Sequence, residues 1–150
     1  MSQERVQRRL AAILFADVVG YSRLTGQDEV GTWRRLQSVL RDVVRPRVRT
    51  HAGRVVRIKG DGILVEFASA VEAVASAVAL QQAMARRNAT LADAQRIELR
   101  IGINLGDIIT NDDDVLGDGV NVAARIDRGR TPTACKAAAS TLPRAGLAGG

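Results

Sequence analysis

The sequence predicts a single α+β domain in which the elements follow the order βαββαβ and an antiparallel sheet carries both helices on one face. Three observations support this prediction. A near-continuous apolar run opens the chain, two β-type runs flank a glycine-rich turn near its middle, and two stretches of helical spacing lie between the strands. With 150 residues, the chain is long enough to bury a core of its own.

The first strand and the first helix follow from the apolar pattern. Residues 1–9 are polar and should form a flexible N-terminus, whereas residues 10–16 are almost all apolar, as in a strand that is buried on both faces. Residues 28–49 have apolar side chains at helical spacing, and Pro46 should kink or loosen the last turn of that helix. The apolar positions are Val30, Trp33, Leu36, Val39, Leu40, Val43 and Val44.

The middle of the chain predicts a β-hairpin. Residues 55–58 and 63–67 are β-type runs on either side of Gly60-Asp61-Gly62, and an Asp-Gly pair in this setting is a strong hairpin signal. The turn would place the carboxylate of Asp61 at the exposed tip of two strands. An equally simple interpretation is a tight turn in which aspartate only tolerates the backbone conformation.

The second half of the chain predicts another helix and a third layer of strand. Ser69 and Glu72 form a capping-box pattern at the start of a helix that closes near residue 88. Its expected buried stripe consists of Val71, Val74, Ala75, Val78 and Met84. The later segments are an alternating strand at residues 97–104, a returning strand at residues 108–109, a turn at residues 111–114 and a short helix at residues 118–126.

Composition narrows the function classes. Aromatic residues make up only 3% of the chain, so it offers few surfaces on which single-stranded nucleic acid could stack. The net charge of +6 does not gather in one patch, because half of it lies in residues 127–150 and the rest is arginine on helical faces. We therefore expect no nucleic-acid partner.

The cysteine count and the hydropathy indicate a reducing compartment. Cys135 is the single cysteine and His51 the single histidine, so an intrachain disulfide is excluded and a Cys/His nucleophilic site is not expected. No apolar run approaches the roughly 20 residues of a membrane span, and the N-terminus lacks an apolar signal core. The expected location is cytoplasmic, without a membrane partner.

Two carboxylates are the main candidates for chemistry. In a sheet of the predicted order, the first strand lies beside the hairpin, so Asp17 and Asp61 should end close together on one edge. Carboxylate oxygens suit Mg²⁺ or Mn²⁺, which commonly share a phosphate partner, and two such ions can support phosphoryl or nucleotidyl transfer. The loop at residues 18–22 runs from a strand into a helical segment, so its amides could cradle phosphate oxygens.

Four sequence blocks occur together in a recognisable order. They read FADVVGYS at residues 15–22, KGDG at residues 59–62, RIGINLG at residues 100–106 and GDGVNVAAR at residues 117–125. In this order and spacing they resemble the class III adenylate/guanylate cyclase catalytic domain, over residues 10–126. The resemblance implies a ferredoxin-like fold and the conversion of a nucleoside triphosphate to a 3′,5′-cyclic monophosphate and pyrophosphate.

The resemblance also implies roles for individual residues. Asp17 and Asp61 match the two metal-binding aspartates, with Val18 as a further metal contact, for two Mg²⁺ or Mn²⁺ ions per site. Val19, Gly20 and Tyr21 belong to the loop that binds the nucleotide.

Two further residues match the family's catalytic pair. Asn121 and Arg125 correspond to the residues that act on the ribose and on the transition-state phosphate. Four residues apart on a helix, they share one face, and a planar guanidinium suits charge that builds on phosphate oxygens. Without the other blocks, a polar, solvated helix face would be the preferred interpretation of both residues.

The base-selecting positions depart from the family pattern. Arg57 stands where family adenylate cyclases usually have lysine, and Asp114 stands at its partner position. The two could still recognise adenine, and the pair typical of guanine is absent, so ATP is favoured over GTP. The alternatives are an ion pair of Arg57 across the hairpin and an Asp114 that is only one of several acids in a turn.

The family builds each site from two subunits, so the resemblance implies a homodimer with two shared sites and an inactive monomer. We expect the cyclase-like domain at residues 10–126 to be truncated and residues 127–150 to form an irregular tail, and we hypothesise a change of reading frame near residue 126. The alternative function is a non-catalytic remnant that binds nucleotide or dimerises. A ferredoxin-like module that binds RNA or protein is a third interpretation.

Overall fold

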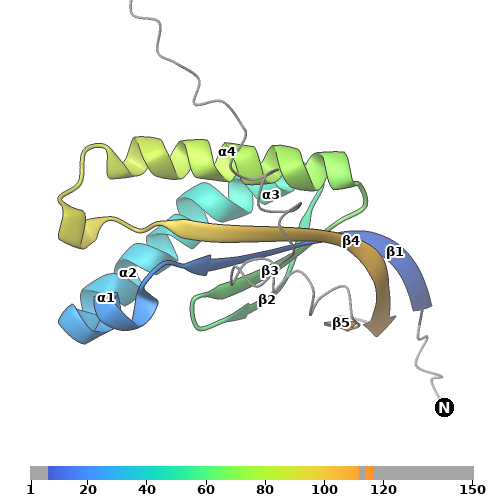
Figure 1. The fold of residues 1–150 in the computed structure, drawn as a ribbon, viewed down its shortest axis with the longest axis horizontal. Helices are drawn as coiled ribbons and strands as arrows, with labels where there is room; N and C mark the ends of the chain where they lie inside the picture. The colour runs from blue at the N-terminus through green and yellow to red at the C-terminus, as the bar shows by residue number, and fades with distance from the viewer. Residues whose placement is uncertain (1–6, 112–113, 117–150) are drawn as a thin grey trace, which may run out of the picture.

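The computed structural model describes residues 7–111 and 114–116 (Figure 1). The elements, in chain order, are β1 (Gln7–Val18), α1 (Tyr21–Gln27), α2 (Glu29–Val39), the π-helix η1 (Leu40–Val44), α3 (Arg45–Thr50), β2 (Arg54–Lys59), β3 (Gly62–Phe67), α4 (Ala70–Asn88), the 3₁₀-helix η2 (Asp93–Gln95), β4 (Leu99–Asn111) and β5 (Asp114–Leu116). The predicted α+β class and its antiparallel sheet are confirmed.

The sheet has the strand order β2-β3-β1-β4-β5, and every neighbouring pair is antiparallel. β1 is the central strand, and it pairs with β4 from Gln7 opposite Thr110 to Val18 opposite Leu99. The predicted returning strand at residues 108–109 is wrong, because these residues continue β4 without a turn. The long, unbroken pairing with β1 keeps this segment in the same strand.

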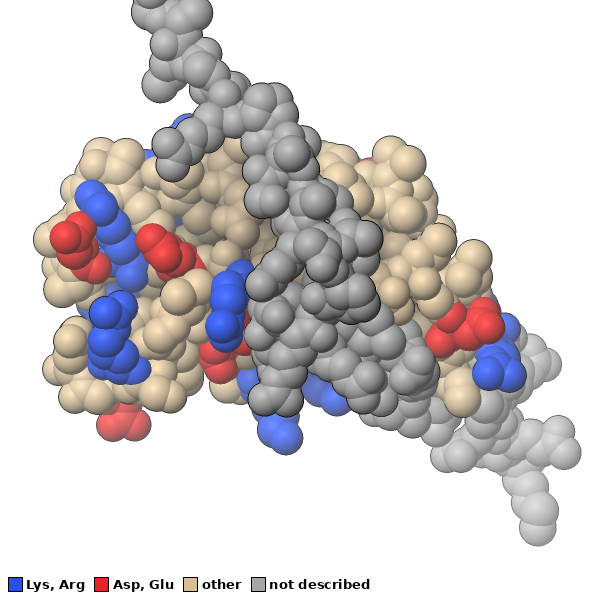
Figure 2. All heavy atoms as spheres, in the orientation of Figure 1, with Lys and Arg blue, Asp and Glu red and all other residues tan. Residues whose placement is uncertain are grey.

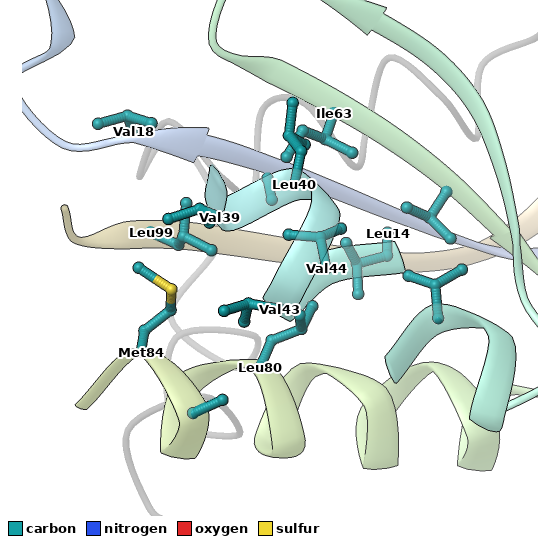
Figure 3. Close-up of a cluster of buried hydrophobic side chains, with 14 of the residues drawn as sticks. Leu14, Val18, Val39, Leu40, Val43, Val44, Ile63, Leu80, Met84 and Leu99 are labelled. Atoms are coloured by element: carbon teal, nitrogen blue, oxygen red, sulfur yellow. The ribbon is translucent and has the colours of Figure 1, made fainter. Parts of the chain in front are cut away.

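The helices cover one face of the sheet. Alternate residues of β1, including Ala12, Leu14 and Ala16, belong to a buried cluster shared with the helices. Figure 3 shows Leu80 and Met84 pointing from α4 towards Val43 of η1 and Leu99 of β4. The opposite face carries a smaller cluster that, among the described residues, comes from strands alone. Its buried members are Ala11, Ile13, Leu64 and Ile108.

The long helical segment after β1 contains an irregularity before Pro46. In η1, the Arg45 amide donates to the Leu40 carbonyl five residues back, as in a π-helical turn. Pro46 has no amide to donate, and the guanidinium of Arg47 contacts the carbonyls of Asp42 and Val43 at 3.5 and 3.1 Å. The arginine side chain therefore supplies a hydrogen-bond donor to the turn in which the proline has none.

α4 begins as expected but buries a different stripe. The Ser69 hydroxyl accepts a hydrogen bond from the Val71 amide. Of the predicted stripe, Met84 is buried, whereas the side chains of Val71 and Val74 are exposed at 76% and 48%. The buried positions are Ala73, Ser76, Leu80, Ala83 and Met84. Small residues on this stripe let α4 approach the sheet closely, which hydrophobicity alone does not reveal.

The remaining expectations concern residues 118–150 and the absence of a membrane span. The predicted helix at residues 118–126 and the predicted tail at residues 127–150 lie outside the described residues. Within the described residues, none of the helices combines the length and the apolar character that a membrane span requires.

Candidate metal and nucleotide site

Asp17 lies at the end of the central strand, on the face of the sheet away from the helices. Its neighbours Ala16 and Val18 point into the helix-covered core, and side chains alternate along a strand, so Asp17 points the other way. The residue is only 9% exposed. A buried carboxylate needs a partner, so its contacts define the chemistry of this corner.

The β2–β3 hairpin brings the second carboxylate to the same corner. Its loop consists of Gly60 and Asp61, and Gly60 has φ +61°. Asp61 lacks a positive φ, which is the pattern of a type II′ turn with glycine in the first position. The hairpin prediction is confirmed, although the loop pair is Gly-Asp and not Asp-Gly. One carboxylate oxygen of Asp61, Oδ2, accepts a hydrogen bond from the Val18 amide at 3.2 Å.

This hydrogen bond ties the tip of the hairpin to the end of β1. Asp17 and Val18 are consecutive, so the carboxylates of Asp17 and Asp61 lie at the same end of the sheet. The predicted proximity of the two aspartates is therefore present in the structure. It arises from the pairing of β1 with β3, in which Ala16 lies opposite Ile63.

Arg100 completes this corner, and the sequence analysis gave it no role. It lies directly opposite Asp17 in the β1–β4 ladder, although 83 residues separate the two in the chain. Its Nε donates to Asp17 Oδ1 at 2.9 Å and its Nη2 to Asp17 Oδ2 at 3.0 Å, a bidentate pair. The usable signal was the alternation in residues 99–104, which places Arg100 and Gly102 on the face opposite Leu99 and Ile101.

The donor set fits a hard divalent cation that also binds phosphate. Among the described residues, no group of three or more His, Cys, Asp or Glu side chains could hold a metal ion. The site instead offers two carboxylates. Mg²⁺ is commonly bound through one or two carboxylates, with waters and substrate phosphates filling the other positions. Asp17 and Asp61 fit that mode. Val18 contributes its amide to Asp61, and its metal contact stays a prediction.

In the loop after β1, two of the amides predicted to bind phosphate already have hydrogen-bond partners. The Val18 amide is bonded to Asp61, and the Val19 amide donates to the Glu98 carbonyl at 2.9 Å. Gly20 adopts the left-handed conformation, with φ 65° and ψ 32°, and turns the chain into α1. Tyr21, which begins α1, is half-buried against the main core. The first amides of α1 have no hydrogen-bond partner within the helix, and they are therefore the candidate donors to phosphate oxygens in this loop.

The predicted base-selecting residues lie on two short outer strands. Arg57 is exposed in β2, opposite Leu64 and beside a β-bulge. Asp114 begins β5, where it pairs with Asn111 of β4. These strands occupy opposite edges of the sheet, yet the β5 backbone comes within 8 Å of β2, measured between Cα atoms. The predicted catalytic residues Asn121 and Arg125 lie outside the described residues.

Two other features of the described residues are less promising for chemistry. A cavity of about 440 Å³ lies beside α4, and its polar side chains Gln81 and Asn88 donate to the backbone carbonyls of Leu99 and Ile97. These contacts fix the strand and do not point to a ligand. At the left and the right of the face shown in Figure 2, Lys and Arg side chains lie next to Asp and Glu side chains.

Comparisons with known proteins agree with the fold. A family model described as the adenylate and guanylate cyclase catalytic domain matches residues 4–143. The chain is 56% identical over 127 residues to a Rhizobium meliloti (strain 1021) protein named "Putative adenylate cyclase 3", and 36% identical over 124 residues to an adenylate cyclase of Streptomyces coelicolor. These alignments cover 85% and 83% of the chain.

A solved structure shows the same similarity. The structure named an adenylate/guanylate cyclase/hydrolase from Silicibacter pomeroyi matches with a TM-score of 0.78 and 42% identity, over 83% of this chain and 72% of that one. The chain spans only 22% and 31% of the length of the two curated relatives. The family model covers most of the chain, and the chain therefore belongs to the family of adenylate and guanylate cyclase catalytic domains.

Proposed function

We propose that this chain is the catalytic domain of an adenylate cyclase, which converts ATP to 3′,5′-cyclic AMP and pyrophosphate with two divalent cations in a homodimer. In this reaction the ribose 3′-oxygen attacks the α-phosphorus, and the bond from that phosphorus to the β-phosphate oxygen breaks. The observation that carries the proposal is the hydrogen bond from the Val18 amide to Asp61, which brings two carboxylates to one corner of the sheet.

The described residues have distinct roles in this proposal. Asp17 and Asp61 would hold Mg²⁺ or Mn²⁺, which supplies charge stabilisation for the attacking oxygen and for the triphosphate. Gly20 and Tyr21 would present backbone amides to the triphosphate, at the start of α1. The core contacts of Tyr21 and the left-handed turn at Gly20 would hold these amides at the start of α1.

The remaining roles rest on the family resemblance. Arg57 and Asp114 would contact the adenine edge, which is supported by the approach of β5 to β2. Asn121 and Arg125 of the second subunit would complete the site by holding the ribose and the transition-state phosphate. The relatives named adenylate cyclase favour ATP as the substrate.

The proposal is tested by measuring cyclic AMP formed from ATP and Mn²⁺ by the purified chain and by its Asp61→Asn variant. Asparagine keeps an oxygen that can accept from the Val18 amide, so the fold should persist while the charge is lost. We expect the rate to fall roughly 100-fold or more, because the metal ligand is neutralised.

A matched control is Asp107→Asn. Asp107 is exposed on β4 and pairs with Leu10, at the far end of β1 from Asp17. This variant should keep the wild-type rate. Equal activity in the wild type and in Asp61→Asn would contradict the proposed metal site. A folded wild-type chain that forms no cyclic AMP would instead support the alternative of a non-catalytic remnant, and a preference for GTP would contradict the assignment of ATP.

A further inference from the structure

We propose that Arg100 is a positioning residue that competes with the metal ion for Asp17, so that metal binding requires its guanidinium to withdraw. This inference rests on the proposed function, because it takes Asp17 as a metal ligand. In this inference, Arg100 lowers the affinity of the site for the metal ion.

The geometry of the pair leads to this competition. The guanidinium donates to both carboxylate oxygens of Asp17, at 2.9 and 3.0 Å. A metal ion needs a lone pair of at least one of these oxygens on the side that faces Asp61. The cation would also stand beside the positive charge of Arg100 if the arginine stayed in place. The two cations therefore favour different arrangements around one carboxylate.

The exposure of the two partners decides which one can move. The Asp17 side chain is only 12% exposed and lies at the end of the central strand, whereas the Arg100 side chain is 47% exposed. Arginine is long and can rotate its charged end towards solvent while its stem stays on the sheet. Asp17 is short and fixed by the backbone of β1. The exchange therefore consists of a rotation of Arg100 and leaves the strands unchanged.

The pairing also has a positive role. A buried carboxylate without a partner is costly, and Arg100 supplies that partner when Asp17 has no other cation. Arg100 thereby holds the Asp17 carboxylate in one orientation at the end of β1. The cost is a weaker apparent affinity for the metal ion, because the ion must first displace a bidentate pair.

The chain contains a closely matched control pair. Arg54 donates to Glu66 at 2.9 Å, and this arginine side chain is also 47% exposed, while Glu66 is 5% exposed. Glu66 has a second partner in Arg9. Glu66 lies opposite Ile13 and Arg54, away from the hairpin tip that carries Asp61. Substitution of Arg54 thus removes a similar ion pair without touching the metal corner.

The test measures Mn²⁺ binding directly, by the loss of the aqueous Mn²⁺ electron paramagnetic resonance signal and by isothermal titration calorimetry. The full 150-residue chain is compared with Arg100→Met, Arg100→Lys and Arg54→Met. We expect Arg100→Met to bind Mn²⁺ roughly tenfold more tightly, since the competing bidentate pair is gone. Arg100→Lys keeps the charge but not the fork, and it should tighten binding by about two- to threefold. Arg54→Met should bind as the wild type does.

Thermal unfolding provides a second readout. Arg100→Met should have a lower Tm than the wild type without metal, because Asp17 loses its partner, and Mn²⁺ should raise the Tm of this variant by more than it raises that of the wild type. If Arg100→Met does not fold, Arg100→Lys carries the same test. Unchanged or weaker Mn²⁺ affinity in the folded Arg100 variants would overturn the proposal.

The variant Asp17→Asn separates this inference from the proposed function. If Asp17→Asn loses Mn²⁺ binding and the Arg100 variants bind as the wild type does, only the competition is overturned. If the wild type, Asp17→Asn and the Arg100 variants all fail to bind Mn²⁺, the metal site itself is overturned along with it.

Discussion

Gly20 controls the direction in which the chain leaves the central strand. Its left-handed backbone conformation, with φ 65° and ψ 32°, turns the chain from the metal corner into the first turn of α1. A side chain at this position would meet the Arg23 guanidinium only at ordinary contact distance, with Nη2 3.5 Å from an added Cβ. The requirement for glycine is therefore one of backbone conformation and not of space.

Gly20→Ala should lower the free energy of unfolding by about 1 kcal/mol, because alanine is strained in the left-handed region. Gly20→Asn should cost less, since asparagine visits this region more readily. Urea denaturation of the two variants and the wild type measures both effects. Equal stability of the alanine and asparagine variants would contradict the conformational explanation.

The continuous helical segment from α2 through η1 to α3 is the element with the most unusual backbone. It stays helical through Pro46 because the chain widens to a π-helical turn before the proline and because Arg47 caps the carbonyls left over. The buried residues Val43 and Val44 of this turn belong to the main core, so the irregularity lies against the sheet and not in a loose end.

Arg47→Met should destabilise the fold by about 1 kcal/mol, because the carbonyls of Asp42 and Val43 lose a donor. In a Pro46→Ala background the same change should cost less, since the new amide can serve a carbonyl of the previous turn. A double-mutant cycle from urea denaturation measures the coupling. Additive effects of the two substitutions would show that Arg47 does not compensate for the proline.

The elements also show which features the sequence can predict. The proximity of Asp17 and Asp61 was predictable, because it follows from strand order, and strand order follows from the βαββαβ pattern. The partner of Asp17 was not predictable. Arg100 lies opposite Asp17 only in one register of β1 and β4, and these strands lie far apart in the chain. Register depends on side-chain packing across the whole sheet, and the hydrophobic periodicity of a single strand gives no information about that packing.

Helix faces show a second limit. In α4 the valines at positions 71 and 74 are exposed while Ala73 and Ser76 are fully buried. The sequence reasoning ranked residues by apolar character, yet a helix that packs closely on a sheet favours small side chains along the line of contact. The same reasoning succeeded for Leu36, Val39 and Val43, which are buried in the main core. It failed for Val30 and Trp33 of the same helical segment, which are exposed at 59% and 57%.

At the scale of the whole molecule, the proposed active site is formed by residues from two copies of the chain. The described residues supply the carboxylate corner, whereas the family resemblance assigns Asn121 and Arg125 to a partner copy. In a two-fold symmetric dimer each site then takes the carboxylates from one chain and the Asn/Arg pair from the other.

This arrangement predicts complementation. Asp61→Asn and Arg125→Ala should each be inactive alone, and mixing equal amounts should recover about a quarter of the wild-type rate, because half of the dimers would be mixed and each would have one intact site of two. The measurement is cyclic AMP formation after mixing. The control mixture of Asp61→Asn with Asp17→Asn should recover nothing, since both changes damage the same half-site. No recovery in the first mixture would contradict the shared site.

The pairing of β1 with β4 has a consequence for folding. The central strand β1 is synthesised before the other strands of the sheet. One of its two neighbours, β4, begins only at Leu99. The apolar run at residues 10–16 therefore lacks one neighbouring strand until β4 has been synthesised. Contacts between such distant segments close slowly, since a long loop must be ordered first. Arg100 can reach Asp17 only when β1 and β4 pair, so the corner that carries the proposed chemistry cannot be complete before this long-range pairing forms.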